Sequence, residues 1–585
     1  MLRGFCVWAP RPRSVDLLLP DGRHPMTRDE HGWWHVCADV PPESTYAFSL
    51  DGGDPRPDPQ ALRLPDGPHG WSQLYDPDEF VWSDGNWTGV ELPGSVIYEV
   101  HVGTFTEAGT LDAAVERLPH LVNLGVTMVE LLPLAPFPGE RGWGYDGVAP
   151  FAVHEAYGGP AALQRFVDAA HAVGIGVCLD VVYNHLGPDG NYLAEFGPYL
   201  TDHHHTPWGP ALNLDAPESD HVRRWVLDNV TQWLRDFHID ALRLDAVHEL
   251  HDDRALHLLE EMSRQVDQLS EQVGRQLWLI AESDRNDPGA VTPRGRLNMV
   301  GGQGLHAQWA DDVHHALHVT VTGETQGYYA DFAADPDRYG ESPLAKVLRT
   351  PFFHDGTYSS FRGRRHGRPV DPATTPGWRF VASLQTHDQV GNRAVGDRIS
   401  ALASPGLLAC GAAILLTSPW TPMLFMGEEW GASTPWQYFT DHTDPALGEA
   451  VREGRRSEFA EFGWDADDVP DPQDPQTFLR SRLDWGEVDR DPHARLLAWY
   501  RALITLRRSR VDLRDAHLDA VEVNHDVEAG TLQVRRGAHT LVVNLSGTKH
   551  RFEVSGTVLL SWEPGVQAIS GSVEVPPRCA VVLGP

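Results

Sequence analysis

Asp240-Ala241-Leu242-Arg243-Leu244-Asp245 follows a polar helical segment and has the alternation of a short β-strand. Because side chains two positions apart in a strand share a face, Leu242 and Leu244 should face one side and Arg243 and Asp245 the other. A guanidinium beside a buried carboxylate favours the ionised carboxylate, which is the form that can act as a nucleophile. A structural ion pair inside a barrel is an equally good interpretation of this segment alone.

The sequence around this strand predicts a parallel sheet covered by helices. Apolar, strand-like runs occupy residues 96–102, 126–132, 176–182 and 277–282. Helical spacing of apolar residues lies between them, at Leu163, Phe166, Val167 and Ala170 and again at Val222, Val226, Val230 and Trp233. Near-continuous apolar strands alternating with helices are typical of a sheet buried on both faces. With a closing strand at 423–427, the pattern predicts an α/β fold, a (β/α)8 TIM barrel with insertions.

The two ends of the chain have a different texture. At 585 residues the chain is too long for one ordinary core,. Short apolar runs at 15–19 and 46–50, each followed by Gly, Pro or Asp, predict an N-terminal β-sandwich over residues 1–90,. Strand-like runs at 532–534 and 541–544 predict a small all-β C-terminal domain over residues 513–585. The barrel domain is therefore expected at residues 91–512.

Composition excludes several functional classes. The chain has 47 Lys and Arg against 82 Asp and Glu, a formal net charge of -35. Such a field repels nucleic acids and anionic membranes, but not a neutral sugar. The five cysteines are scattered and form no CxxC pair, which argues against a disulfide framework and a zinc site,. The start of the chain has no signal-peptide pattern, and the apolar run at 407–416 is too short to cross a bilayer,. We expect a cytoplasmic protein that binds neither nucleic acid nor membranes.

Polar residues gather where the predicted strands end. The active sites of (β/α)8 barrels lie at the C-terminal ends of the strands. Here those positions hold Asp180, Asn184-His185, Asp245, Glu282 and His387-Asp388. A single acid at a strand end is usually a cap or a solvated loop residue. Several at successive strand ends of one barrel indicate an active site.

Four of these segments, 180–185, 240–245, 280–282 and 385–388, resemble in order and spacing the motifs of the α-amylase superfamily, glycoside hydrolase family 13. At the N-terminus, residues 5–10 and 32–34 resemble the module that precedes isoamylase- and branching-type α-glucan enzymes. The resemblance implies that Asp245 is the nucleophile, Glu282 the acid/base and Asp388 the carboxylate that holds the distorted sugar. It also implies contacts to the reacting sugar from Arg243, His185, His387 and the stacking platform Tyr145.

The chemistry explains why these residue types are needed. Hydrolysis of an α-glucoside with retention requires two carboxyl groups about 5–5.5 Å apart, one attacking the anomeric carbon and one protonating the leaving oxygen. Asp245, beside Arg243, should stay ionised. Glu282, which follows the apolar run 277–281, is better placed to hold a proton and later to activate water.

Further segments, 308–315, 361–367, 387–393, 427–430 and 437–442, resemble the maltooligosyltrehalose trehalohydrolases within that superfamily. This resemblance implies hydrolysis of the α-1,4 bond next to the terminal trehalose of a maltooligosyl trehalose, with trehalose as product. It also implies functional coupling to a maltooligosyltrehalose synthase. Candidates for recognition of the leaving group are His248, Glu249, Trp309, Asp311, Phe361 and Arg362. For Trp309 and Phe361, packing within a loop is the alternative.

We expect no cofactor and no catalytic metal. His203-His204-His205 has no obvious spaced partner ligands, and Asn184 matches a calcium-ligating position of many α-amylases without recognisable acidic partners,. One rival interpretation is a glucan branching or debranching enzyme on the same scaffold. Another is a non-catalytic glucan-binding protein, but the presence of all three carboxylates argues against it.

Overall fold

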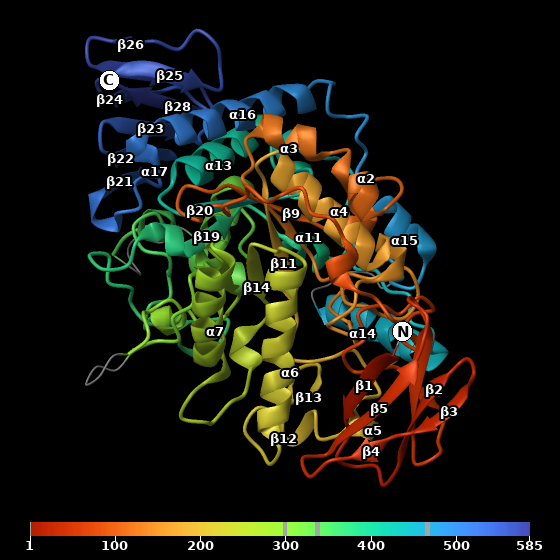
Figure 1. Ribbon diagram of the computed structural model, residues 1–585. Helices are drawn as coiled ribbons and strands as arrows, with labels where there is room; N and C mark the ends of the chain where they lie inside the picture. Colours follow the sequence, from red (N-terminus) through yellow and green to blue (C-terminus); the bar gives the residue numbers. More distant parts are fainter. Residues whose placement is uncertain (1, 296–300, 334–339, 462–468) are drawn as a thin grey trace.

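A closed barrel of eight parallel strands forms the centre of the molecule (Figure 1). The computed structural model describes residues 2–295, 301–333, 340–461 and 469–585. In chain order the barrel strands are β9 (Ile97–Val100), β10 (Met128–Leu131), β11 (Gly176–Val181), β14 (Ala241–Leu244), β15 (Trp278–Ala281), β16 (Ala307–Trp309), β19 (Phe380–Ser383) and β20 (Thr421–Phe425). β20 pairs with β9 and closes the ring, so the predicted (β/α)8 barrel is confirmed.

Helices that lie between the barrel strands in sequence, or follow the last of them, cover the outside of the barrel (Figure 1). They are α3 (Leu118–Leu124), α4 (Gly159–Ala172), α6 (Ser219–Thr231), α7 (Leu258–Val273), α8 (Asp311–Thr322), α13 (Pro405–Thr417) and α16 (His493–Ser509). The helical spacing predicted at 163–170 falls within α4, and that predicted at 222–233 covers α6 and the π-helical turn Gln232–Asp236 that continues it. The most apolar run of the chain becomes α13, whose residues from Leu408 to Thr417 are buried against the barrel. No helix within the described ranges is long and apolar enough to cross a membrane.

The strand β14 has the sidedness expected from its sequence. Leu242 and Leu244 are buried in the core between strands and helices. Arg243 points into the barrel, where it lies in register with Asp180 of β11 and Ile280 of β15. Because the strands are parallel, the residues that follow them, including Asp245 and Glu282, come together at one end of the barrel.

Small antiparallel sheets occupy both ends of the chain (Figure 1). The N-terminal strands are β1 (Leu2–Trp8), β2 (Val15–Leu19), β3 (Gly22–Pro25), β4 (Thr27–Arg28), β5 (Trp33–Asp39), β6 (Thr45–Leu50), β7 (Pro55–Arg56) and β8 (Ser72–Gln73). The C-terminal strands are β21 (Val521–Asp526), β22 (Thr531–Arg536), β23 (His539–Asn544), β24 (His550–Glu553), β25 (Thr557–Ser561), β26 (Ala568–Ile569), β27 (Ser572–Val575) and β28 (Cys579–Gly584).

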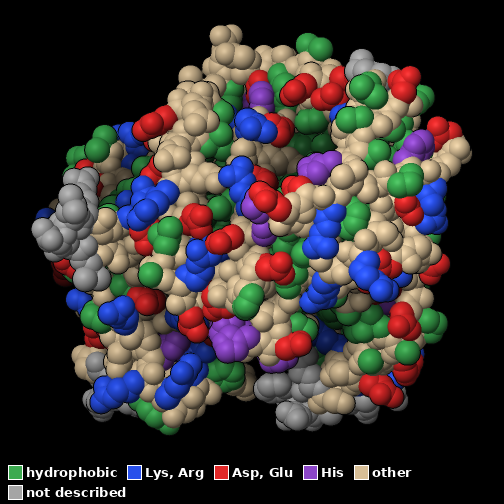
Figure 2. Space-filling model, turned by 60° about the horizontal axis from the view of Figure 1, so that its bottom comes forward, with side chains coloured by type: hydrophobic (Ala, Val, Ile, Leu, Met, Phe, Trp, Pro, Cys, Tyr) green, Lys and Arg blue, Asp and Glu red, His purple; other side chains and the backbone are tan. Residues whose placement is uncertain are grey.

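Loops after the barrel strands carry secondary structure of their own. The loop after β11 forms the hairpin β12 (Leu200–Thr206) and β13 (Gly209–Leu212), and the connection between α8 and β19 forms β17 (Tyr358–Ser359) and β18 (Arg364–Arg365). The segment after β20 contains α14 (Pro445–Glu461) and α15 (Pro475–Arg480). On the face shown in Figure 2, acidic and basic side chains are intermixed and hydrophobic ones are scattered among them.

Candidate active site

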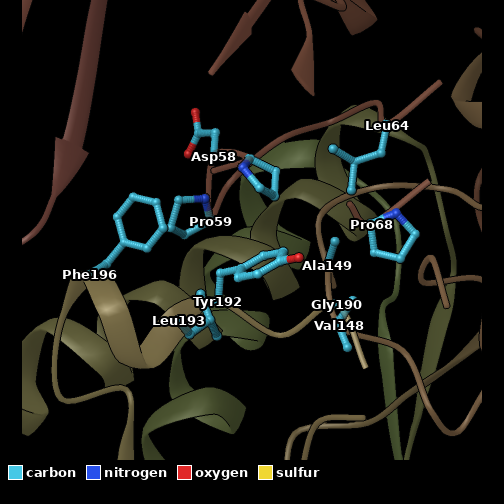
Figure 3. Close-up of a pocket in the computed structure, with 11 residues that line it drawn as sticks. Asp58, Pro59, Leu64, Pro68, Val148, Ala149, Gly190, Tyr192, Leu193 and Phe196 are labelled. Atoms are coloured by element: carbon cyan, nitrogen blue, oxygen red, sulfur yellow. The ribbon is translucent and has the colours of Figure 1, made fainter. Parts of the chain in front are cut away.

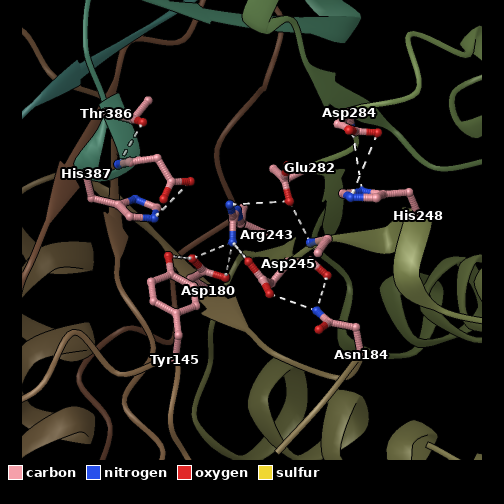
Figure 4. A network of polar contacts seen from close by, with 12 residues as sticks. Tyr145, Asp180, Asn184, Arg243, Asp245, His248, Glu282, Asp284, Thr386 and His387 are labelled. Atoms are coloured by element: carbon pink, nitrogen blue, oxygen red, sulfur yellow. Dashed lines mark hydrogen bonds and ion pairs between the residues drawn. The ribbon is translucent and has the colours of Figure 1, made fainter. Parts of the chain in front are cut away.

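Arg243 is the centre of a network of carboxylates at the C-terminal end of the barrel (Figure 4). Its Nη1 donates hydrogen bonds to Asp245 Oδ1 at 2.7 Å and to both oxygens of Asp180 at 2.9 and 3.0 Å. Its Nη2 lies 3.8 Å from Glu282 Oε2. One buried guanidinium therefore faces both the predicted nucleophile and the predicted acid/base. The alternation in the sequence had predicted that Arg243 and Asp245 face the same side.

The turn after β14 carries Asp245 and also contributes a backbone hydrogen bond to Glu282. Ala246 has φ 40° and ψ 53°, a left-handed conformation that is strained for a residue with a Cβ,. Its N–H donates to Glu282 Oε2 at 2.6 Å, while the side chain of Asn184 donates to Asp245 Oδ2 at 2.8 Å. The strained turn thus orients Glu282, and Asn184 orients Asp245.

Burial raises the pKa of two carboxyl groups of the site, those of Glu282 and Asp311. Removal from water raises the pKa of Glu282, and the charges of Asp245 and Asp388 raise it further against the opposing charge of Arg243. A raised pKa lets a carboxyl group hold a proton near neutral pH, as a general acid must. Burial, together with Glu282 and Asp388, also raises the pKa of Asp311 to about 8.

Asp388 and His387 lie in the short helix α11 (His387–Gly391) after β19, capped by Thr386. The Nε2 atom of His387 lies 3.5 Å from Asp388 Oδ2, and Asp388 is the more exposed of the two. The ring of Tyr145 stacks on His387 with centroids 5.1 Å apart, and its hydroxyl donates to Asp180 Oδ2 at 2.6 Å. The predicted stacking platform therefore lies against His387 and is anchored to the Arg243 network.

Several residues predicted to recognise the leaving group are joined through Asp284. Arg362 Nη1 donates to Asp284 Oδ2 at 2.8 Å, and Asp284 Oδ1 lies 3.9 Å from His248 Nε2 (Figure 4). Glu249 Oε2 lies 3.2 Å from His251 Nε2. Phe361, at the turn of the β17–β18 hairpin, is exposed beside Tyr328. The hydrogen bond from Arg362 to Asp284 joins the hairpin of β17 and β18 to the loop after β15.

Trp309, which was predicted to contact the leaving-group sugar, lies against Arg243. It is only 4% exposed, at the end of β16 inside the barrel. The guanidinium of Arg243 lies 4.4 Å from the centroid of its ring. Trp309 therefore holds the side chain of Arg243 in place, and its contact with a sugar stays a prediction.

The residues considered as metal ligands have other partners. The Oδ1 atom of Asn184 faces His185 Nδ1, and its amide donates to Asp245. His185 also packs on the exposed Trp208, with ring centroids 4.6 Å apart. These contacts hold Asn184 in the carboxylate network.

The expectation that the His203–His205 run lacks spaced partners is wrong for His204. Its ligand atom and those of Asp215 and Asp253 lie within 4.8 Å of one another. However, His204 Nε2 and Asp215 Oδ2 are 2.9 Å apart, a hydrogen-bond distance, and the Asp253 side chain is 83% exposed. A hydrogen-bonded pair beside a solvated acid accounts for this group without an ion.

Two residues of the network, Asp284 and Glu99, were missed in the sequence. Asp284 follows the predicted acid/base by two positions, but its partner Arg362 is 78 residues away. Glu99 is completely buried in β9 and lies 2.5 Å from His387 Nδ1. The signal for Glu99 was present, since it is a lone acid in the apolar run 96–102, and a buried charge requires a partner.

A separate small pocket lies between the connection at 57–68 and the loops after β10 and β11 (Figure 3). Its lining is mainly apolar and includes Leu64, Val148, Tyr192, Leu193 and Phe196. None of the predicted site residues is among the residues that line it. The pocket lies where the N-terminal segment contacts the loops of the barrel, and its lining shares no residue with the carboxylate network.

Comparisons with known proteins agree with the barrel fold. The family model of the alpha-amylase catalytic domain matches residues 73–208. A solved structure from Salmonella typhimurium is 37% identical, with a TM-score of 0.90, over 100% of this chain and 98% of that chain. A pullulanase from Bacillus acidopullulyticus shares the fold, with a TM-score of 0.71 at 17% identity, over 100% of this chain and 74% of that chain. The fold and the site thus define a protein of the α-amylase class.

Curated relatives narrow the class further. A malto-oligosyltrehalose trehalohydrolase from Arthrobacter ramosus is 56% identical over 93% of this chain and 93% of its own length. Another, from Rhizobium sp. (strain M-11), is 52% identical over 99% of this chain and 97% of its own length. The chain belongs to the malto-oligosyltrehalose trehalohydrolase family.

Proposed function

We propose that the chain is a retaining glycosidase that hydrolyses the α-1,4 bond next to the terminal trehalose of a maltooligosyl trehalose and releases trehalose. Asp245 attacks the anomeric carbon while Glu282 protonates the leaving oxygen, and Glu282 then activates the water that frees the glycan. Asp388 holds the hydroxyls of the distorted sugar. The observation that carries the proposal is the position of Arg243, whose terminal nitrogens face Asp245 and Glu282 at 2.7 and 3.8 Å.

Recognition of trehalose is assigned to the group around Asp284. Arg362, His248 and Glu249 approach the C-terminal end of β15 from two loops, and Asp311 and Phe361 complete this side of the site. Trp309 acts through Arg243. Because the enzyme takes a 1,1-linked substrate, a partner such as a maltooligosyltrehalose synthase must supply it, and coupling to that enzyme is part of the proposal.

Product analysis on maltotriosyl trehalose and on maltopentaose tests the proposed function. The three carboxylates alone would cleave any α-1,4 bond, so the leaving-group side must choose the position. A site that hydrogen-bonds particular hydroxyls rejects a substrate in which they are arranged differently, because its polar groups are left unpaired. We expect trehalose plus maltotriose from the first substrate and much slower cleavage of the second. Equal rates, or glucose as the main product, would contradict the assignment, and branched products from amylose would favour a branching enzyme.

Arg362→Ala should weaken the preference for the trehalose end. A charged hydrogen bond contributes about 1.5–3 kcal/mol, so we expect KM for maltotriosyl trehalose to rise about tenfold or more, with little change for maltopentaose. Steady-state kinetics on both substrates measure the difference. Arg368→Ala is the matched control, since Arg368 lies on the same loop, pairs with Asp287 at 3.4 Å and is 70% exposed. Equal changes of KM for the two substrates would remove Arg362 from trehalose recognition.

A further inference from the structure

His387 is held from both sides by carboxylates. Its Nδ1 lies 2.5 Å from Glu99 Oε1, and its backbone N–H donates to Glu99 Oε2 at 3.0 Å. Its Nε2 faces Asp388 Oδ2 at 3.5 Å. Glu99 uses both oxygens on one residue, and its side chain is 1% exposed. A fully buried carboxylate costs free energy unless it is paired, and His387 is the partner of Glu99,.

The orientation of Asp388 depends on how many protons His387 carries. A neutral imidazole that gives its Nδ1 proton to Glu99 keeps a lone pair on Nε2. That lone pair would face the carboxylate of Asp388 and repel it. An imidazolium donates from both nitrogens and attracts Asp388 instead. The position of Glu99 therefore bears directly on the carboxylate proposed to hold the distorted sugar.

We propose that Glu99 is a positioning residue that keeps His387 doubly protonated, so that the Nε2–H of His387 holds Asp388 in place during catalysis. This inference rests on the role proposed for Asp388 in the hydrolysis of an α-glucoside. Glu99 itself touches neither substrate nor reacting atoms. It acts from β9, on the opposite side of the His387 ring from the sugar-binding carboxylate.

The charged groups around His387 support this state. Burial alone would lower the pKa of His387, but the charges of Asp388 and Glu99 outweigh it and raise the pKa to about 9. Other titratable groups that act on His387, from the strands and loops packed against it, are Arg243, His101, Asp180 and Glu130, and the titratable Tyr145 stacks on its ring. Arg243 and His101 oppose the charge of His387, and the two acids favour it when ionised.

The direction of the pH effect follows from these values. The pKa of about 9 lies above the ordinary 6.5 of histidine, so His387 keeps its charge until the pH rises through about 9. Without the charge of Glu99, burial still lowers the pKa of His387, and Asp388 is the remaining adjacent carboxylate that raises it. Loss of one adjacent opposite charge shifts a pKa by about 1–3 units. If activity requires charged His387, the alkaline loss of activity should therefore occur at lower pH in a variant without the charge of Glu99.

The test is the pH dependence of kcat/KM for α-maltosyl fluoride in the wild type and in Glu99→Gln. Fluoride leaves without a proton, so the alkaline limb on this substrate does not report the general acid Glu282. We expect the limb near pH 9 in the wild type and about 1–3 units lower in Glu99→Gln, with activity recovering at lower pH,. A purely structural role would lower the rate by the same factor at every pH.

Two further variants separate charge from packing. Glu99→Asp keeps the charge, so its limb should stay near that of the wild type even if the rate falls. Glu428→Gln is the matched control, because Glu428 is a buried acid of the same barrel that bonds to Tyr500 and Gln385 and not to His387. Its limb should not move.

The outcomes distinguish this inference from the proposed function. An unmoved limb in Glu99→Gln, or a wild-type limb near pH 6.5, would overturn the role of Glu99 while leaving the glycosidase assignment intact. The wild-type measurement does so even if Glu99→Gln does not fold. A wild type that cannot hydrolyse the fluoride at any pH would instead contradict the assignment of the carboxylates.

Discussion

Replacing Glu282 by Gln is expected to lower kcat for maltotriosyl trehalose by about 10⁴-fold or more while the fold stays intact. One general acid–base step contributes about 10²–10⁴-fold, and Glu282 serves in both halves of the proposed reaction. The amide is nearly isosteric and can keep the bond from the N–H of Ala246. Steady-state kinetics with circular dichroism measure the effect. Near-native turnover in a folded variant would exclude Glu282 as the acid/base.

The two roles of Glu282 can be separated with α-maltosyl fluoride. The first step needs no acid on this substrate, so kcat/KM should change little. The second step still needs a base to activate water, so the glycosyl-enzyme should accumulate. Mass spectrometry of the intact protein should detect a maltosyl adduct. Asp519→Asn, an exposed acid before β21, is the control and should neither slow turnover nor accumulate an adduct.

The barrel was predictable because its signals are local. Continuous apolar runs gave β9, β10, β11 and β15 to within two residues at each end, since a strand buried on both faces needs apolar side chains throughout,. A short apolar run also gave β2 at Val15–Leu19. The strand β16 was not identified, because three residues are too few to show a period,. The helices α14 and α15 were not predicted, because they lie in a segment after β20 that is rich in Pro and Asp.

The site was predictable where spacing along the chain sets the geometry. Arg243 and Asp245 are two residues apart in a strand, so their common face follows from the sequence alone. The pairs Arg362–Asp284 and His387–Glu99 are 78 and 288 residues apart, and only the closed barrel brings them together. The left-handed turn at Ala246 was likewise invisible, because alanine gives no sign of a positive φ,.

Arg243 explains how two similar carboxyl groups can take different roles. It donates a short hydrogen bond to Asp245 but only approaches Glu282, at 3.8 Å. Burial raises the pKa of Glu282, and the charge of Arg243 opposes this rise only in part,. A carboxylate held by a guanidinium and a neighbouring acid with a raised pKa fit the two roles proposed for them in a retaining glycosidase.

Asp245→Asn is expected to abolish turnover of both maltotriosyl trehalose and α-maltosyl fluoride, by about 10⁵-fold or more, which is comparable to loss of the nucleophile in other covalent enzymes. The amide cannot form the glycosyl ester, whichever leaving group is present. The fold should survive, because Arg243 keeps its two hydrogen bonds to Asp180 and is not left as an unpaired buried charge,.

Intact mass spectrometry with α-maltosyl fluoride then separates the two carboxyl groups. Glu282→Gln should carry a maltosyl adduct, and Asp245→Asn should carry none, even when Glu282→Gln is introduced beside it. An adduct on the Asp245→Asn protein would mean that another residue attacks the sugar, and Arg243 with Asp245 would then be a structural ion pair of the barrel. Inversion of the anomeric centre by the wild type, followed by NMR, would lead to the same conclusion, since a covalent intermediate on Asp245 requires retention.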